Sequence, residues 1–194
     1  MHPLDWLAAL GLAALLPIPI YWFIIHPFAG YWRRRGVTAT FRIAVPAAAL
    51  LAWTFLYFTR GRLFAASQAP LWAKATGLLL IGIALYVFGR VKKELGTARL
   101  LGKTELSGGG ELRVTGLYEH VRHPSYAAQM ATMLGIGLIA GTLTLWVVAA
   151  VWAALLNVAI RFEERELLAR FGEPYRAYRA RVPAFLPFRS RPRE

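Results

Sequence analysis

The sequence predicts an all-α integral membrane protein, and three observations support this. Of the 194 residues, 57% are hydrophobic and only 17% are charged, a balance that is unusual for a soluble domain of this size. Several apolar stretches are long enough to cross a bilayer as helices, and Lys and Arg gather in the polar segments between them. We expect one bundle of about five transmembrane helices, because five spans of about 20 residues occupy roughly half of the chain.

Four apolar stretches have the length of a transmembrane helix or nearly so, and they cover residues 4–25, 41–58, 71–88 and 142–160. A fifth stretch, 125–140, has 16 residues and would measure about 24 Å as a helix. It adjoins the last span almost directly, so 125–160 is predicted to form a tight helical hairpin. The chain thus divides into three N-terminal spans (1–88) and a core (89–194) that contains the hairpin and a C-terminal amphipathic segment.

Prolines in the first two spans predict local distortions of the helices. Pro17 and Pro19 lie in the first span and Pro46 in the second, where each removes a backbone hydrogen bond. The N-terminus carries Asp5 instead of the basic residues of a cleaved signal peptide, so we expect the first span to be retained.

The positions of Lys and Arg predict the orientation in the membrane. Successive spans place the polar segments alternately on the two sides of the membrane. Of the 23 basic residues, all but Arg60, Arg62 and Lys74 then fall in segments on the same side. The positive-inside rule then predicts an outside N-terminus, five spans and a cytoplasmic C-terminus. The net charge of +13 is explained by this orientation and by anionic lipid head groups, so we predict no nucleic-acid partner. The cytoplasmic segments, the 89–124 loop and the C-terminal helices, are left to form the functional region.

The composition and the spacing of residues exclude several kinds of site. The chain has no cysteine, which excludes disulfides and thiolate chemistry, and its four histidines show no metal-ligand spacing. We therefore predict no metal. The three glycines at 108–110 lack the spacing of a dinucleotide-binding loop.

The first candidate site is the sequence HVRHP, which precedes the short span. Pro124 suits the first turn of a helix, and the free N–H groups that follow make this end attractive to anions. Together with His120, Arg122 and His123 it could hold a carboxylate or phosphate. The alternative is that Arg122 extends to lipid head groups and the histidines cap the helix.

The second candidate site lies where the last span ends. Asn157, Arg161 and Glu164 are spaced to share one helical face, and Glu163 is adjacent to them. Buried charges near hydrocarbon are costly unless they pair or bind a ligand. The alternative is an ordinary pair between Arg161 and Glu164. An amphipathic stripe of Leu and aromatic residues follows, and Gly172 with Pro174 is expected to break it.

These motifs resemble a known family. The sequence GLYEHVRHPSY, then a hydrophobic hairpin, then EERELLARFGEPYRAY and VPAFLP, is similar to the isoprenylcysteine carboxyl methyltransferases and the related phospholipid methyltransferases of bacteria. The resemblance covers about residues 90–188, roughly half of the chain. It implies a methyltransferase that uses S-adenosylmethionine, releases S-adenosylhomocysteine, and binds the donor between the two motifs.

The resemblance also implies which residues bind the donor, and the chemistry of the side chains suggests their roles. The cofactor-binding residues would be Gly116, Leu117, Tyr118, Val121, Arg122, His123, Pro124, Tyr126, Glu163 and Glu164. One of the two glutamates would pair with the donor's ammonium, and His123 or the helix N-terminus would meet its carboxylate or ribose. For the reaction itself, His120 or Glu164 would act as a base for an amine or thiol, and Arg161 would orient a carboxylate.

The acceptor is expected to be lipid-like or a small hydrophobic molecule that enters from the bilayer. The Ala- and Arg-rich composition indicates a bacterial inner-membrane protein and argues against a prenylated protein as acceptor. Two alternatives remain open at this point. One is an NADPH-dependent reductase similar to the sterol reductases, whose C-terminal motifs are related. The other is a membrane adaptor without enzymatic activity.

Overall fold

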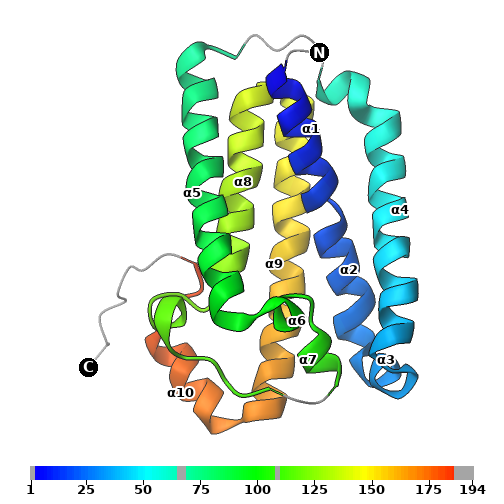
Figure 1. The fold of residues 1–194 in the computed structure, drawn as a ribbon, viewed down its shortest axis with the longest axis vertical. Coiled ribbons are helices and arrows are strands. Elements are labelled where there is room, and N and C mark those ends of the chain that lie inside the picture. The colour runs from blue at the N-terminus through cyan, green and yellow to red at the C-terminus, as the bar shows by residue number, and fades with distance from the viewer. Residues whose placement is uncertain (1–2, 65–68, 108–109, 186–194) are drawn as a thin grey trace.

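The computed structural model describes residues 3–64, 69–107 and 110–185, which form helices and connecting segments without any strand. Four helical segments in this part of the chain are long and apolar enough to cross a membrane: Pro3–Arg35, Val37–Leu63, Leu71–Leu95 and Leu143–Phe171. The predicted all-α membrane fold is thereby confirmed. The long helices lie alongside one another, with α10 and the short α6 and α7 at one end (Figure 1).

The predicted short span is helix α8, Pro124–Ala140, which has 17 residues. It is shorter than the four segments above, at about 25 Å, and it lies between α5 (Leu71–Leu95) and α9 (Leu143–Phe171) (Figure 1). Gly141 ends α8 in the left-handed conformation, and the Thr142 side chain caps α9 by accepting the Leu145 amide. The predicted hairpin is therefore present, and a fifth span at α8 stays a prediction.

The prolines act differently in the first two spans. The first span is divided into α1 (Pro3–Leu15) and α2 (Pro17–Ile25), as the prolines predict. Helix α4 (Val37–Leu63) instead continues through Pro46 without ending. Between them, a 3-10 turn η1 (His26–Phe28) and α3 (Ala29–Arg35) reverse the chain at the polar end of the bundle.

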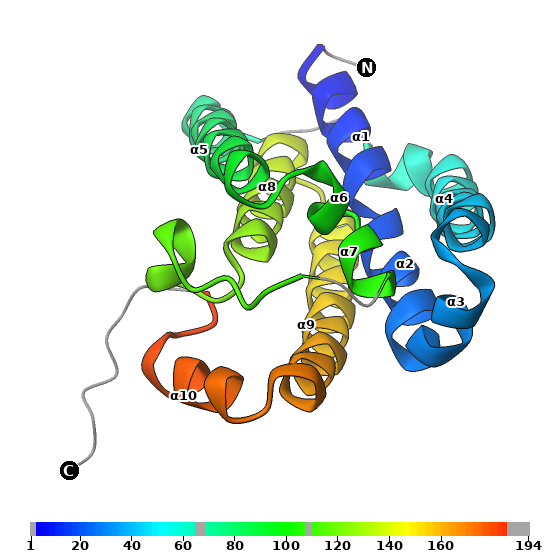
Figure 2. The same ribbon diagram turned by 60° about the horizontal axis from the view of Figure 1, so that its bottom comes forward.

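The remaining short elements gather at that same end. They are α6 (Thr97–Leu100), α7 (Lys103–Leu106), the 3-10 turn η2 (Gly116–Glu119) and α10 (Glu173–Arg181). Figure 2 shows them around the ends of α5, α8 and α9. Gly172 separates α9 from α10 with φ 57°, which confirms the predicted break. Residues 111–115 are irregular, and residues 186–188 of the C-terminal aromatic segment lie outside the described residues.

Glycines allow α8 to approach two other helices closely. A Cβ on Gly77 of α5 would lie 2.6 Å from the carbonyl oxygen of Gly135, and a Cβ on Gly135 would lie 2.6 Å from that of Gly77. Towards α1, a Cβ on Gly11 would lie 2.6 Å from Cδ1 of Ile136. Helix α8 is therefore the element against which both α1 and α5 pack closely.

Candidate functional site

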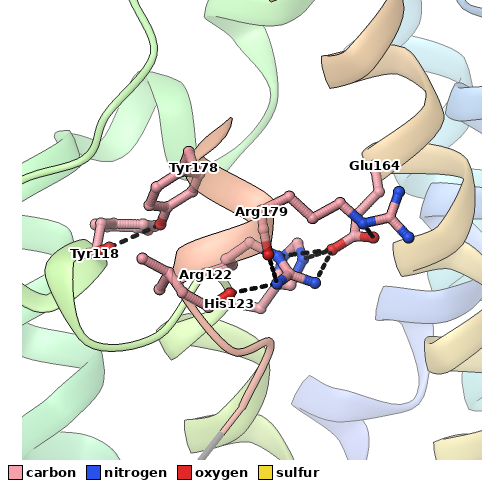
Figure 3. Close-up of polar contacts among 7 residues, drawn as sticks. Tyr118, Arg122, His123, Glu164, Tyr178 and Arg179 are labelled. Atoms are coloured by element: carbon pink, nitrogen blue, oxygen red, sulfur yellow. Dashed lines mark hydrogen bonds and ion pairs between the residues drawn. The ribbon is translucent and has the colours of Figure 1, made fainter. Parts of the chain in front are cut away.

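The predicted first and second motifs meet at one buried carboxylate, that of Glu164 in α9. Arg122 donates to its Oε1 from Nε at 3.0 Å and from Nη2 at 2.7 Å, and His123 donates to the same oxygen from Nε2 at 3.1 Å. Nε of Arg179, from α10, lies 3.4 Å from Oε2. The side chains of His123 and Glu164 are only 4% and 10% exposed, so these are charge-assisted bonds away from water. Figure 3 shows the arrangement.

Arg122 also fastens the segment before α8 to the segment after α10. Its Nη1 donates to the carbonyl oxygens of Arg179, at 3.1 Å, and of Val182. The backbone amides of Arg122 and His123 donate to the carbonyls of Pro183 and Ala184 at 2.9 and 3.0 Å. His123 therefore does not cap α8 with its side chain, and the Arg122–Glu164 contact serves to hold two distant parts of the chain together.

Three tyrosines lie beside this contact. The hydroxyl of Tyr178 donates to the carbonyl oxygen of Tyr118 at 2.7 Å (Figure 3). Burial raises the pKa of Tyr178 to about 12, although the Arg122 charge opposes the rise. Burial likewise raises the pKa of Tyr118 and of Tyr175 above the usual range, with nearby glutamates adding to the rise. All three hydroxyls therefore remain neutral donors at physiological pH.

A cavity of about 580 Å³ begins at these tyrosines and extends into the bundle, a size typical of small-molecule sites. Its polar end is lined by Arg99, Arg113, Tyr118, Arg122, His123, Glu163, Tyr175 and Tyr178. Its apolar arm is lined by Leu7, Leu10, Gly11 and Ala14 of α1 and by Ile81, Ala84, Leu85 and Phe88 of α5. One face of α8, with Ser125, Ala128, Gln129, Thr132 and Ile136, forms the floor between them.

Unpartnered polar atoms concentrate in this cavity. Within the described part of the chain, five buried side-chain atoms have no hydrogen-bond partner: His26 Nε2, Arg113 Nε, Gln129 Oε1, Glu163 Oε2 and the Tyr175 hydroxyl. All five belong to residues that line the cavity. Because buried polar groups in folded proteins are nearly always paired, this coincidence indicates a polar ligand.

The structure divides the predicted cofactor-binding residues into two groups. Those that line the cavity are Tyr118, Arg122, His123, Tyr126 and Glu163. Those that do not line it are Gly116, Leu117, Val121, Pro124 and Glu164. Glu94 of α5 explains the position of Gly116 and Leu117. Its Oε2 accepts a hydrogen bond from the Leu117 amide at 3.1 Å and would lie 2.5 Å from a Cβ on Gly116. Gly116 is thus required by close packing at φ 68°.

The predicted catalytic residues are not brought together. His120 and Arg161 are exposed and do not line the cavity. Asn157 is exposed too, and its amide donates to the carbonyl of Ala153 in its own helix at 2.8 Å. The expectation that Asn157, Arg161 and Glu164 form one wall of the site is therefore corrected, because only Glu164 is buried and it turns towards Arg122. The chemical roles assigned to His120, Arg161 and Glu164 stay predictions.

Sequence reasoning missed a second buried cluster at the cavity. His26 Nδ1 donates to Glu166 Oε2 at 2.9 Å, and Arg33 pairs with the other oxygen of Glu166. The His26 ring also stacks on Trp22, with 4.8 Å between ring centroids. His26 and Glu166 are 140 residues apart, so no local spacing connects them. The available signal was a histidine and a glutamate at the polar ends of two apolar spans, which are costly there without a partner.

Known proteins that are similar to this chain include methyltransferases. A model of the phospholipid methyltransferase family matches residues 72–173. Methanethiol S-methyltransferase 2 of Bradyrhizobium diazoefficiens is 40% identical over 43% of this chain and 31% of its own length. Protein-S-isoprenylcysteine O-methyltransferase of Schizosaccharomyces pombe is 35% identical over 37% of this chain and 31% of its own.

The family model covers residues 72–173, and thus the core more than the N-terminal spans. The nickel-cobalt-cadmium resistance protein NccN of Alcaligenes xylosoxydans xylosoxydans is 33% identical over 54% of this chain. The chain thus spans between 31% and 41% of the length of these three relatives. No solved structure matches the chain. The family model nevertheless covers more than half of the sequence, including Arg122, His123, Glu163 and Glu164, and the chain belongs to the phospholipid methyltransferase family.

Proposed function

We propose that the protein is a methyltransferase that uses S-adenosylmethionine and methylates a hydrophobic acceptor at the cytoplasmic face of the membrane. The observation that carries this proposal is the cavity itself. It joins a polar end with unpartnered hydrogen-bonding atoms to an apolar arm between α1 and α5. A polar donor and an apolar acceptor would meet in such a space.

The polar end fits S-adenosylmethionine, which when bound supplies an electrophilic methyl group on a sulfonium. The unpartnered Oε2 of Glu163 would accept a hydrogen bond from the ammonium group, and Nε of Arg113 would donate to the carboxylate. The Tyr175 hydroxyl would hydrogen-bond to the ribose. Glu163 suits the ammonium better than Glu164 does, because both oxygens of Glu164 are already held by cationic side chains.

The apolar arm fits a hydrocarbon acceptor that comes from the bilayer. Its walls include Leu10 of α1 and Leu85 of α5, whose side chains are 68% and 65% exposed and would face lipid. The floor of α8 contributes Gln129, whose amide oxygen lacks a partner and would orient a polar head group. The arm and the polar end would therefore bind the two substrates side by side.

Methyl transfer requires alignment of the nucleophile with the sulfonium methyl group and removal of water. The residues of this chain supply both. The node of Arg122, His123 and Glu164 fixes the start of α8 against α10, and buried Tyr175 and Tyr178 close the polar end with Leu112 and Leu167 packed around them. The excess of Lys and Arg at this end supports a cytoplasmic location.

Isothermal titration calorimetry on the detergent-purified protein tests the donor. We expect S-adenosylhomocysteine to bind and NADPH not to bind. Glu163→Gln should weaken S-adenosylhomocysteine by about 10- to 100-fold, because a charge-assisted hydrogen bond contributes about 1.5–3 kcal/mol. The matched control is Glu173→Gln, which alters an exposed glutamate paired with Arg176 and should leave the affinity unchanged. Binding of NADPH alone would support the reductase, and binding of neither would support the adaptor.

A further inference from the structure

We propose that His26, oriented by Glu166, is the general base that removes a proton from the acceptor, and that the acceptor is an apolar thiol. This proposal rests on the function proposed above and adds the chemical class of the acceptor. It concerns His26 of the first span, which lies outside both sequence motifs, and Glu166 of α9, which lies within the second motif but has no role assigned to it by the sequence.

A bonded pair of an imidazole and a carboxylate lies in the wall of the cavity. His26 and Glu166 both line it, and the His26 side chain is only 5% exposed. Since a carboxylate only accepts hydrogen bonds, Nδ1 must carry the proton that bonds to Glu166 Oε2 at 2.9 Å. In the neutral imidazole the other nitrogen, Nε2, then carries a lone pair. Nε2 is buried and has no hydrogen-bond partner in the described part of the chain.

The surroundings hold this ring in place. Stacking on Trp22 at 4.8 Å limits its rotation, and Arg33 of α3 orients Glu166 by pairing with its second oxygen. Arg170 of α9 adds a positive charge near Glu166, and Arg99 and Arg113 line the cavity from the segment between α5 and α8. An imidazole bonded to a carboxylate through one nitrogen is the arrangement that proteins use to present the other nitrogen as a base.

The charges around the cavity select among acceptors. A carboxylate acceptor has no proton to lose at neutral pH, so it would leave this base unused. An alkylamine, with a pKa near 10.4, would enter as a cation, whereas the lining contains four arginines, Arg99, Arg113, Arg122 and Arg170, against two glutamates. A thiol has a pKa near 8.5, about two units above that of an ordinary imidazole. A thiol therefore enters the cavity as a neutral molecule and can transfer its proton to a histidine. The negative charge that then develops on its sulfur is stabilised by the arginines of the lining.

The reaction balances with these groups alone. The proton of the acceptor S–H moves to His26 Nε2 and gives an imidazolium that Glu166 stabilises. A lone pair of the acceptor sulfur forms the new bond to the methyl carbon. The bond between that carbon and the sulfonium sulfur breaks, and its electron pair stays on the donor sulfur, which becomes a neutral thioether. The imidazolium later releases its proton to water.

The two bases expected from the sequence are less suitable in the structure. His120 is exposed and does not line the cavity. Glu164 does not line it either, and its Oε1 already accepts bonds from Arg122 and His123. A base must come within hydrogen-bonding distance of the proton that it removes. His26 lines the cavity and has an unpartnered nitrogen, whereas the unpartnered oxygen of Glu163 is assigned to the ammonium of the donor.

The test uses hexanethiol, hexylamine and hexanoate as acceptors with labelled S-adenosylmethionine, in wild type and in His26→Gln, over pH 6 to 9.5. We expect hexanethiol to be methylated in preference to the other two, with a rate that falls below neutral pH. At pH 7, His26→Gln should lose about 100-fold or more, in the range of general-base catalysis. The loss should shrink towards pH 9.5, where the thiol ionises in water by itself. Arg165→Gln, an exposed change on α9, is the control.

Two further measurements separate this role from a structural one. Calorimetry should show that His26→Gln binds S-adenosylhomocysteine with an affinity within about twofold of wild type. The measurement thus distinguishes a failure of the proposed base from a failure of the proposed donor site. Diethyl pyrocarbonate should modify His26 in the protein without donor, read by peptide mass spectrometry, and hexanethiol should slow that modification. Any of four results would overturn the proposal. Two concern the rates: a loss in His26→Gln that is constant across the pH range, or preferred methylation of hexanoate or hexylamine. The other two are that His120→Gln, and not His26→Gln, abolishes the fall in rate at low pH, or that hexanethiol gives no protection against modification.

Discussion

Removing the charge of Glu164 should open the site locally without abolishing the transmembrane bundle. Glu164 is the common acceptor for Arg122 and His123, and Arg179 lies within 3.4 Å. In Glu164→Gln the amide keeps one acceptor oxygen, but the Arg122 guanidinium, whose side chain is 11% exposed, loses its counter-charge. Breaking a buried pair from one side costs about 3–5 kcal/mol, and the retained oxygen places the expected cost near the lower end, at about 3 kcal/mol.

Hydrogen exchange measures this cost where it should appear. The amides of Arg122 and His123 donate to Pro183 and Ala184 across the junction, so they exchange only when the two segments separate. A loss of about 3 kcal/mol should speed their exchange roughly 100-fold, since each 1.4 kcal/mol is a factor of ten. Amides in the middle of α5 should be unchanged.

The matched control again uses Glu173, whose pair with Arg176 is more than two-thirds exposed on both sides. Exposed pairs contribute about 0–1 kcal/mol, so Glu173→Gln should alter exchange by fivefold or less. If Glu164→Gln changes the Arg122 and His123 amides no more than Glu173→Gln does, Glu164 does not hold the junction and our account of the node is wrong.

Three other predictions follow from described contacts. Gly135→Ala should lower the melting temperature through a clash with the Gly77 carbonyl, at a cost of about 1–3 kcal/mol. The control Gly82→Ala, whose added Cβ would meet open space, should be neutral or stabilising. Equal melting temperatures of the two variants would contradict the close α5–α8 contact. The pKa of Tyr178 is raised from 10.0 to about 12, so the folded state retains a proton that the unfolded chain loses above pH 10, and stability should decline from pH 10 towards 12. In thermal melts taken at each pH, Tyr178→Phe should show a smaller decline than wild type. An identical decline would refute the assignment. Ala14→Phe in the apolar arm should raise the KM for hexanethiol by roughly tenfold or more and leave the S-adenosylhomocysteine affinity unchanged in calorimetry; a matching loss of that affinity would show that the arm and the polar end are not separate.

The sequence predicted the spans well because hydrocarbon thickness constrains length and composition together. Pro17 ended α1 and Gly172 ended α9 as their backbone preferences require. Pro46 did not end α4, since a membrane helix tolerates a missing bond when its other backbone bonds remain. Local patterns thus located the helices and their breaks.

Side-chain direction was harder to predict than helix position. Glu163 and Glu164 are neighbours in one motif, yet Glu163 lines the cavity and Glu164 points to Arg122, because successive helical residues face directions about 100° apart. Knowing which one faces the cavity requires knowing where α10 packs. The His26–Glu166 contact joins residues 140 positions apart, so it depends on tertiary packing that no local pattern encodes.

The junction made by Arg122 also has a consequence for the order of assembly during synthesis. Its partners Glu164 and Val182 lie 42 and 60 residues further along the chain. When the α8–α9 hairpin has entered the membrane, Arg122 therefore still lacks the carbonyl groups that complete its bonding, and the polar end of the cavity has no closing wall. Contacts of such long range form late in folding. Donor binding should thus appear only after residues up to Ala184 have left the ribosome, and a nascent chain that stops at Phe171 should insert fully yet bind no donor.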